Sequence, residues 1–369
     1  MKKGFLFYLD SYPLIKGFIS FAFNKTFHII KLFNSECKNS STTVLISLSR
    51  IGDTIFTLPS IKALKKNSPK LTIICFNHSK IIYELFIDDV NYIVVDAKEI
   101  KFGGRIINKK YRFLLKQLNP EKIFDLTGSI LSASLIFNSK AKIIIGFNEC
   151  YFKEIYSTYI VKREKPHLID MYLEVIRLQY NISDVEINRE FPASFNRGDK
   201  ILIHPFAGWA AKEWNINKYI ELSELLLSDY NVSWIFAQSN SNEKLTELLK
   251  LKKINYIITG SLIDLVEELK SCSCIVSNDS GPLYLASALG KPTFTIYGPT
   301  NPAYSKPYGQ NHRAICKQIS CSPKTDEQYC HKDAGRLCKY YECMDLLSVN
   351  EVYSEVKRFL EKLNILKSS

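Results

Sequence analysis

Short apolar runs rich in β-branched residues recur along the chain and alternate with segments long enough to form helices. Each run is typical of a strand buried on both faces, and the alternation predicts a parallel sheet covered by helices on both sides. The pattern therefore predicts an α/β chain with two doubly wound domains of about five strands each. The runs lie at 42–49, 71–76, 92–97, 122–127 and 142–147, and again at 200–208, 232–238, 255–260, 274–279 and 293–298.

A charged segment at 150–199, which carries Pro166 and Pro192, separates the two series of strands. We expect this segment to join the domains, because composition shifts and prolines mark boundaries between folded units. The expected parts are an extension at 1–40, an N-terminal domain at 41–180 with a linker to about 199, a C-terminal domain at 200–345 and a closing helix at 346–369.

Within residues 12–33, polar side chains recur at every third or fourth position. On a helix they would form one narrow stripe surrounded by aromatic and aliphatic residues. A basic amphipathic helix of this kind suits the interface of an anionic membrane, and it suits equally a helix packed on the protein's own core. The stripe consists of Lys16, Ser20, Asn24, His28 and Lys31.

The formal net charge of the 369-residue chain is +12, which indicates an acidic partner. Nucleic acid, an anionic membrane and a phosphorylated or carboxylated substrate all fit, and so does a general lysine bias of the proteome. No recognised nucleic-acid-binding module is present in the sequence, so we expect no nucleic acid partner.

No apolar run reaches the length of a transmembrane helix, and no cleavable signal is evident at the N-terminus. The apolar stretch there is interrupted by Lys16, Asn24 and Lys25. We therefore expect a cytoplasmic protein whose ten cysteines are reduced.

Ligands of doubly wound sheets bind where strands end and helices begin, and three such turns carry candidate chemistry. At the first, Arg50, Gly52 and Asp53 follow the strand at 42–49. An Asp at this position can simply cap the helix. The turn lacks the G-x-G-x-x-G spacing, which argues against a nicotinamide-dependent enzyme.

The second turn, "HPFAGWAAKEWN", places Lys212 in a loop of small residues just before a helix. A lysine beside exposed backbone N–H groups suits a diphosphate, although a solvated loop lysine would have the same sequence. The loop lacks the spacing of a P-loop, so it does not indicate an ATPase of that class.

The third turn follows the strand at 274–279, where Ser280 and Gly281 begin a helix. Uncapped N–H groups at a helix start attract anions, and Gly281 would let a ligand approach the backbone. Asp279 could accept hydrogen bonds from sugar hydroxyls. Tyr284, one turn further along, is expected at the rim of this site.

Four segments in this order resemble the heptosyltransferase family, glycosyltransferase family nine. The last of them is long and specific, and together they extend over roughly residues 42–345. They are "SRIGDTIFTLPSIKALK", "DLTGSILSASL" at 125–135, "HPFAGWAAKEW" and "VSNDSGPLYLASALGKPTFTIYGPTNP".

The resemblance implies a GT-B fold, in which two Rossmann-like domains flank an interdomain cleft. It also implies an inverting, metal-independent transfer of heptose or a related sugar from a nucleotide-diphosphate donor, most simply ADP-heptose. The implied acceptor is the acidic inner core of lipopolysaccharide, on the inner face of the bacterial inner membrane. No cofactor and no metal are implied.

The resemblance also assigns roles to individual residues. Asp53 matches the general base and Lys212 the lysine that neutralises the leaving diphosphate. The donor-binding residues it implies are His204, Lys212, Glu243, Asp279, Ser280, Gly281 and Tyr284, and the acceptor-binding residues are Arg50, Asp125 and Ser129.

Two residues depart from the family pattern. Tyr284 stands where the family has His, and a phenol that titrates near pH ~10 is a poor proton shuttle at neutrality. Phe206 replaces the glycine of the loop before Lys212, which is expected to change how closely a diphosphate approaches. A glycosyltransferase-like binding protein without catalysis, or a family member with another donor, is therefore an alternative, although Asp53, Lys212 and Asp279 are all retained.

Five cysteines and a histidine gather near the C-terminus. Their spacing lacks the paired C-x-x-C of common zinc sites, so reduced structural thiols are favoured over a zinc site. They are Cys316, Cys321, Cys330, Cys338 and Cys343, with His331 among them.

Overall fold

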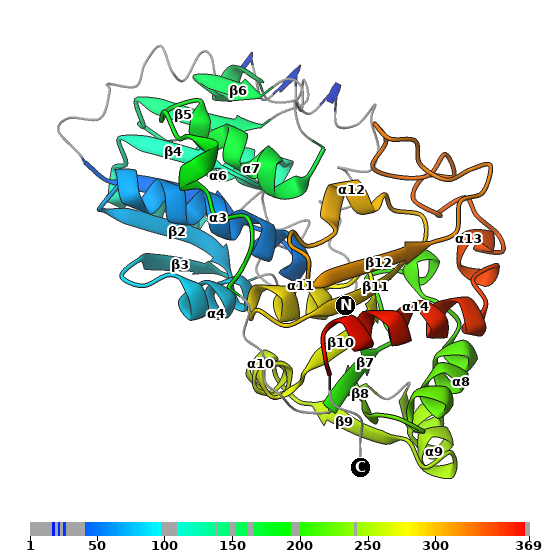
Figure 1. Ribbon diagram of the computed structural model, residues 1–369. Helices are drawn as coiled ribbons and strands as arrows, with labels where there is room; N and C mark the ends of the chain where they lie inside the picture. The colour runs from blue at the N-terminus through cyan, green and yellow to red at the C-terminus, as the bar shows by residue number, and fades with distance from the viewer. Residues whose placement is uncertain are drawn as a thin grey trace. The chain divides into compact units, whose positions relative to one another are not determined.

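The chain consists of two compact units, residues 1–187 and 188–369, each with its own parallel sheet. The division lies inside the segment expected to join the domains. The structure is a computed structural model, shown in Figure 1. It describes residues 17–18, 21–22, 25–26, 41–96, 109–137, 139–147, 153–160, 166–192, 200–239 and 242–365.

Unit 1 contains a sheet in the order β3-β2-β1-β4-β5-β6, with all neighbouring strands parallel. The apolar runs predicted its first five strands, and β6 is an additional edge strand that is too short to show a pattern. The strands are β1 (Thr43–Ser47), β2 (Leu71–Phe76), β3 (Asn91–Val95), β4 (Lys122–Asp125), β5 (Ile143–Phe147) and β6 (Thr158–Ile160).

Helices cover this sheet, and α3 packs against α7. Most of α3 is buried because small and apolar residues surround the whole helix rather than one stripe. The described helices are α3 (Ile51–Asn67), α4 (Asn77–Phe86), α5 (Lys109–Leu118), α6 (Ile130–Ile136) and α7 (Leu168–Arg177), with 3-10 turns at Lys153–Ile155 and Asp184–Glu186.

Unit 2 repeats the arrangement with a parallel sheet in the order β12-β11-β10-β7-β8-β9. It too has six strands rather than about five, because β12 was not recognised in the sequence. The strands are β7 (Lys200–His204), β8 (Asn231–Ala237), β9 (Asn255–Thr259), β10 (Cys274–Asn278), β11 (Thr293–Tyr297) and β12 (His312–Cys316).

The helices of unit 2 include α14, which packs against α8 and provides the expected closing helix. The described helices are α8 (Ile216–Leu226), α9 (Glu243–Leu251), α10 (Leu262–Ser271), α11 (Gly281–Ala288), α12 (Pro302–Ser305), α13 (Glu342–Asp345) and α14 (Val349–Lys362), with a 3-10 turn at Ala210–Lys212.

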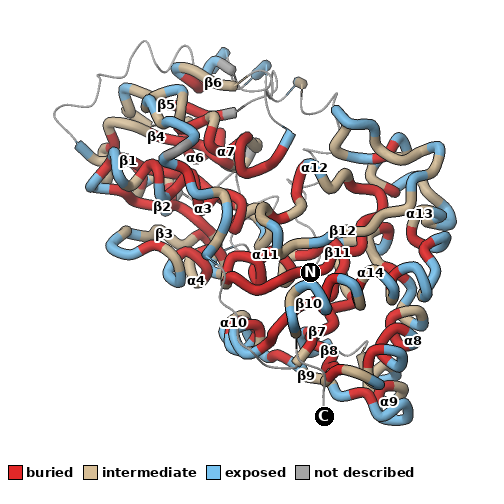
Figure 2. The backbone as a smooth tube through the Cα atoms, viewed as in Figure 1, coloured by how far each residue is buried: buried red, intermediate tan, exposed pale blue. Residues whose placement is uncertain are grey.

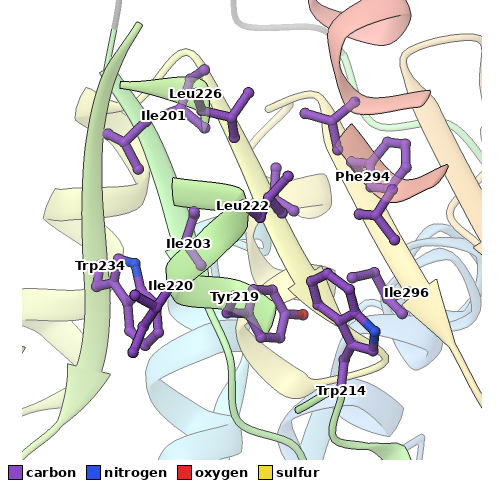
Figure 3. Close-up of a cluster of buried hydrophobic side chains, with 14 of the residues drawn as sticks. Ile201, Ile203, Trp214, Tyr219, Ile220, Leu222, Leu226, Trp234, Phe294 and Ile296 are labelled. Atoms are coloured by element: carbon purple, nitrogen blue, oxygen red, sulfur yellow. The ribbon is translucent and has the colours of Figure 1, made fainter. Parts of the chain in front are cut away.

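The central strands of both sheets are almost continuously buried (Figure 2). In unit 2 a cluster of aromatic and branched side chains fills the space between the sheet and the helices on one face (Figure 3). The polar atoms in this cluster have partners: Trp214 Nε1 donates to the Leu347 carbonyl at 3.1 Å and Trp234 Nε1 to Ser223 Oγ at 2.8 Å. Such pairing lets large aromatic residues be buried without an unsatisfied N–H group.

Both strand orders reverse direction beside the first strand of the unit, between β1 and β4 and between β7 and β10. The connections leave these two strands toward opposite sides, which opens a crevice at their carboxyl ends. The turns that follow β1, β4, β7 and β10 carry most of the candidate residues.

Residues 17–18, 21–22 and 25–26 are helical, in agreement with the helix expected there. The rest of the expected amphipathic segment at 12–33 lies outside the described residues. Among the described residues, no helix is long and apolar enough to cross a membrane.

Candidate active site

Asp53 lies in the first turn of α3, directly after β1. Arg50, the N-cap residue of α3, is extended and its side chain does not cap the helix. Its carbonyl accepts from Thr54 N–H at 2.8 Å. The Asp53 carboxylate is half-buried and accepts a long hydrogen bond of 3.5 Å from the Tyr172 hydroxyl of α7. An acid therefore stands at the positive end of a helix, at the crevice of the first sheet.

Asp125, at the end of β4, is completely buried. One carboxylate oxygen accepts from the Tyr156 hydroxyl at 2.6 Å, and the other accepts from the backbone N–H groups of Thr127 and Gly128 at 2.9 and 3.2 Å. Burial raises the pKa of Asp125, and these hydrogen bonds oppose the rise. Asp125 was expected to contact the acceptor. Its buried carboxylate instead bonds to the backbone of the turn that follows β4, so the structure corrects this expectation.

The other two residues expected to bind the acceptor, Arg50 and Ser129, lie at the starts of two different helices. Arg50 is exposed at the start of α3. Ser129 is the N-cap of α6, and its hydroxyl accepts from Leu131 N–H at 3.2 Å and from Ser132 N–H at 3.5 Å. Thr127 was not predicted from the sequence; its hydroxyl accepts from Leu48 N–H at 2.8 Å and ties the ends of β1 and β4 together.

In unit 2 an ion pair joins the turns after β7 and β10. Lys212 Nζ lies 2.5 Å from Asp279 Oδ2, and the side chains are only 12% and 5% exposed. The same ammonium lies 4.0 Å from the ring centroid of Trp209, a cation–π contact that fixes it from the other side. These two contacts hold the Lys212 ammonium at the carboxyl ends of β7 and β10.

The Asp279 carboxylate is fully engaged by neighbouring side chains. In addition to Lys212, the Thr300 hydroxyl donates to Oδ2 at 2.7 Å and the Tyr284 hydroxyl donates to Oδ1. Burial by itself would raise the pKa of Asp279, but the Lys212 charge and these hydrogen bonds outweigh it, so the pKa lies below its ordinary value. Asp279 is thus held as a carboxylate that positions Lys212.

Tyr284 was expected at the rim of the site. Instead it is only 4% exposed and lies inside unit 2. Its hydroxyl lies 3.4 Å from that of Tyr297, which in turn lies 3.3 Å from Ser305 Oγ. Burial raises the pKa of Tyr284 well above its ordinary value, so the phenol stays protonated and donates to Asp279. The first turn of α11 points this side chain inward because Gly281 and Pro282 occupy the more exposed positions.

Asn278, which was not singled out from the sequence, anchors the Lys212 loop to the end of β10. Its Oδ1 accepts from Trp214 N–H at 3.2 Å and from the Tyr219 hydroxyl at 2.9 Å, and its Nδ2 donates to the Pro205 carbonyl at 2.5 Å. A single buried amide therefore fixes both ends of the loop. Asn278 and Thr300 both lie inside the quoted 276–302 segment, so their position in a specific motif was the available signal.

The start of α11 provides donors for an anion. Ser280 is its N-cap residue but makes no side-chain capping bond; its hydroxyl instead lies 3.0 Å from Ser277 Oγ. His204, 9% exposed at the end of β7, has Nδ1 3.4 Å from Ser277 Oγ and 3.5 Å from Ser280 Oγ. The backbone N–H groups of the first turn therefore have no side-chain cap to compete with a ligand.

The remaining two candidates are Phe206 and Glu243. Phe206 packs into the core, with its ring centroid 6.0 Å from that of Phe236 and 6.2 Å from that of His204. Its side chain therefore supports the loop from the core side, and its effect on the approach of a diphosphate stays a prediction. Glu243 is exposed in the first turn of α9, after β8, the strand adjacent to β7.

Comparison with known proteins identifies the family. A model described as glycosyltransferase family 9 (heptosyltransferase) matches residues 112–334, well over half of the chain. The chain belongs to glycosyltransferase family 9. The match contains Lys212 and Asp279 and begins beyond Asp53. The family membership predicted from the four motifs is confirmed.

Individual relatives have low sequence identity to this chain but match it over most of its length. The lipooligosaccharide heptosyltransferase 2 of Campylobacter jejuni strain 81116 is 23% identical over 322 residues, covering 84% of this chain and 96% of that protein. The lipopolysaccharide heptosyltransferase 1 of Pseudomonas aeruginosa is 21% identical and covers 76% of this chain and 85% of that protein.

Solved structures agree on the architecture. The E. coli ADP-heptose lipopolysaccharide heptosyltransferase II has a TM-score of 0.64 at 17% identity, covering 88% of this chain and 99% of that one. An E. coli heptosyltransferase solved with ADP has a TM-score of 0.65 at 19% identity, covering 87% and 99%. The predicted GT-B fold, with two doubly wound Rossmann-like domains, is confirmed.

The buried His204 predicts a pH dependence of stability. Burial lowers its pKa from 6.5 to about 4, so between these values the unfolded chain binds a proton that the folded chain does not. Stability should therefore fall as the pH drops through this window, with His204 contributing at most about 3 kcal/mol. His204→Gln should make the decline shallower in urea-denaturation curves recorded from pH 7 to pH 4.

His331, which is exposed, provides the control for this measurement. His331→Gln should leave the pH dependence as in the parent protein. An unchanged slope in His204→Gln would show that folding does not lower the pKa of His204.

Proposed function

We propose that this protein is an inverting glycosyltransferase that moves heptose from ADP-heptose to the inner core of lipopolysaccharide, without a metal in the chemical step. Family membership supports the reaction class, and the names of the relatives support the sugar and the acceptor. The observation that carries the proposal is the Lys212–Asp279 ion pair beside the uncapped start of α11.

In the donor half of the proposal, the diphosphate binds between the Lys212 ammonium and the first N–H groups of α11. The carboxylate of Asp279 holds the ammonium in place and does not itself contact the phosphates, whose charge it would repel. Gly281 allows the close backbone approach, and Ser280 and His204 line the same turn. Glu243 is proposed to contact the ribose, because it follows the neighbouring strand.

In the acceptor half, Asp53 takes the proton of the attacking hydroxyl. The oxygen–carbon bond to the acceptor forms as the bond from the anomeric carbon to the diphosphate breaks, and ADP leaves with the electron pair. Lys212 stabilises the charge that develops on the leaving oxygen, which makes a metal unnecessary for that purpose. A single displacement of this kind inverts the anomeric carbon.

Exposed positive charge is proposed to hold the acceptor, which carries carboxylates and phosphates. Arg50 is exposed near Asp53 in sequence and Ser129 lies at the end of the adjacent strand β4, so both remain candidates for acceptor contacts. Asp125 is withdrawn from this role because of its burial.

Membrane association is proposed for the N-terminal helix. Among its described residues, Phe18 and Phe21 are 75% and 60% exposed, and Lys25 Nζ lies 4.8 Å from the Phe21 ring centroid. Exposed aromatic rings with adjacent positive charge suit an anionic lipid surface. The protein would act on the inner face of the inner membrane, with no nucleic acid partner and no cofactor.

Asp53→Asn should lower kcat by ~10²-fold or more while the affinity for ADP changes little, because only the general base is lost. Steady-state kinetics with a core-truncated lipopolysaccharide acceptor and ADP-heptose would measure the first quantity, and calorimetry with ADP the second. Normal turnover in this variant would place the base elsewhere. Tyr172→Phe, which removes the hydroxyl that donates to Asp53, serves as the control for indirect effects and should retain most of the activity.

Lys212→Ala and Gly281→Val should each weaken ADP binding by ~10-fold or more, the first by removing charge and the second by blocking the backbone. Calorimetry with ADP, GDP and UDP would measure the affinities and identify the base at the same time. Lys218→Ala is a matched control, because Lys218 lies on α8 and bonds to the Leu347 carbonyl. Unchanged ADP affinity in both site variants would refute this donor site, and donor binding without any turnover would favour the non-catalytic alternative.

Deleting residues 12–33, or changing Phe18 and Phe21 to Ser in the full chain, should release the protein from anionic vesicles. Flotation with phosphatidylglycerol vesicles, with phosphatidylcholine vesicles as the comparison, would measure this. The two domains should keep their melting temperature. Precipitation of both variants, or full-length protein that ignores anionic vesicles, would support a helix packed on the core.

A further inference from the structure

A long segment of unit 2, residues 317–341, runs between β12 and α13 without a helix or a strand of its own. Its one ladder contact is the isolated bridge between Tyr329 and Thr300. Long irregular segments inside a compact domain are uncommon and need a local source of order. Here tight turns with positive φ at Asp333, Ala334 and Gly335 fold the segment back on itself.

Four cysteine residues line one small cavity at the base of this segment. The room in the cavity is about 10 Å³, which is about the space of one water-sized atom. The four are Cys321, Cys330, Cys338 and Cys343.

The same cavity adjoins the loop that carries Lys212. Ala211 is one of its lining residues. Gly335 approaches Ala211 so closely that a Cβ at Gly335 would stand 2.4 Å from the Ala211 Cβ. Trp209, whose ring supports the Lys212 ammonium, donates from Nε1 to the Ala334 carbonyl at 3.1 Å. The cysteine-rich segment therefore forms one wall of the Lys212 turn.

We propose that these four thiols bind a single tetrahedral metal ion of the thiolate-preferring class, zinc or iron, and that this ion orders residues 317–341. Four cysteines with no exchangeable ligand make a closed, structural site, separate from the chemical step. Four thiolates around a divalent ion carry a net charge of about −2, and Lys332, which also lines the cavity, partly offsets it.

Binding requires a local adjustment. As they stand, the described His, Cys, Asp and Glu side chains include no group of three that is ready to hold an ion. Rotation about the Cα–Cβ bond moves each sulfur between staggered positions, and metal binding displaces the thiol protons. Separate turns of the segment and the start of α13 would each supply one ligand. This is why the sequence lacks the paired C-x-x-C spacing of common zinc sites.

Metal analysis of the full-length protein tests the proposal directly. Protein purified under reducing, oxygen-free conditions without chelator should contain about one equivalent of zinc or iron per chain. The stripped protein should take up about one equivalent of Zn²⁺ or Fe²⁺, and Co²⁺ should give the intense visible bands of a tetrahedral thiolate site. Failure of the reduced wild-type protein to bind any of the three ions would overturn the proposal.

Single serine variants identify the ligands. Cys321→Ser, Cys338→Ser and Cys343→Ser should each weaken metal binding at least ~10-fold. Cys316→Ser is the matched control, because Cys316 is also half-buried and close in sequence but does not line the cavity. Equal metal content in all four variants would show that the ion binds elsewhere. If the serine variants do not fold, thiol titration of the native protein decides: the ion should protect four cysteines from alkylation, and equal labelling with and without it would refute the site.

A second measurement tests the link to the donor turn independently of the proposed activity. Metal loss in Cys338→Ser should weaken ADP binding several-fold, whereas Lys212→Ala should weaken ADP binding and keep the full metal content. Metal binding with the predicted ligands would stand even if ADP were not the donor nucleotide. Unchanged ADP affinity in the metal-free variant would show that the ion orders residues 317–341 without affecting the Lys212 turn.

Discussion

The buried contact between Lys212 and Asp279 is the interaction on which the candidate donor site depends. Two opposite charges can remain in the interior only when they are paired and when their remaining valences are satisfied. Thr300 and Tyr284 supply those hydrogen bonds, and Trp209 covers the ammonium from the other side. Removing any one partner would leave a buried group uncompensated, so the network holds the lysine in a defined position.

The two units place a carboxylate at equivalent positions and use it differently. Asp125 is the last residue of β4, and Asp279 is the first residue after β10. Each of these strands is the fourth of its unit and lies next to the first. In the described part of the chain Asp125 accepts from a hydroxyl and from backbone N–H groups, and burial raises its pKa. The cation beside Asp279, by contrast, lowers the pKa of that carboxyl. One fold therefore yields a structural turn clamp in unit 1 and a charged positioning residue in unit 2.

The support for Lys212 also comes from behind the loop. Asn278 ties the loop to β10, and the segment that contains Ala334 contacts Trp209. These supports are buried or half-buried. A rigid surrounding of this kind places a charge without requiring reorganisation when a leaving group develops charge, which is the general basis of electrostatic catalysis.

The sequence by itself determined the architecture, because apolar runs at strand spacing and two long motifs predict two parallel sheets and the turns at their edges. It could not show β6 and β12: β6 has only three residues, and β12 contains no buried residue and begins with the polar pair His312-Arg313. Only the tertiary structure decided which candidate side chains face inward. Tyr284 and Asp125 were expected to meet ligands and are buried. Tyr172 and Thr300 reach Asp53 and Asp279 from other segments, and four cysteines from separate turns line one cavity. Contacts of this kind depend on how helices and loops pack, and local spacing carries no record of that packing.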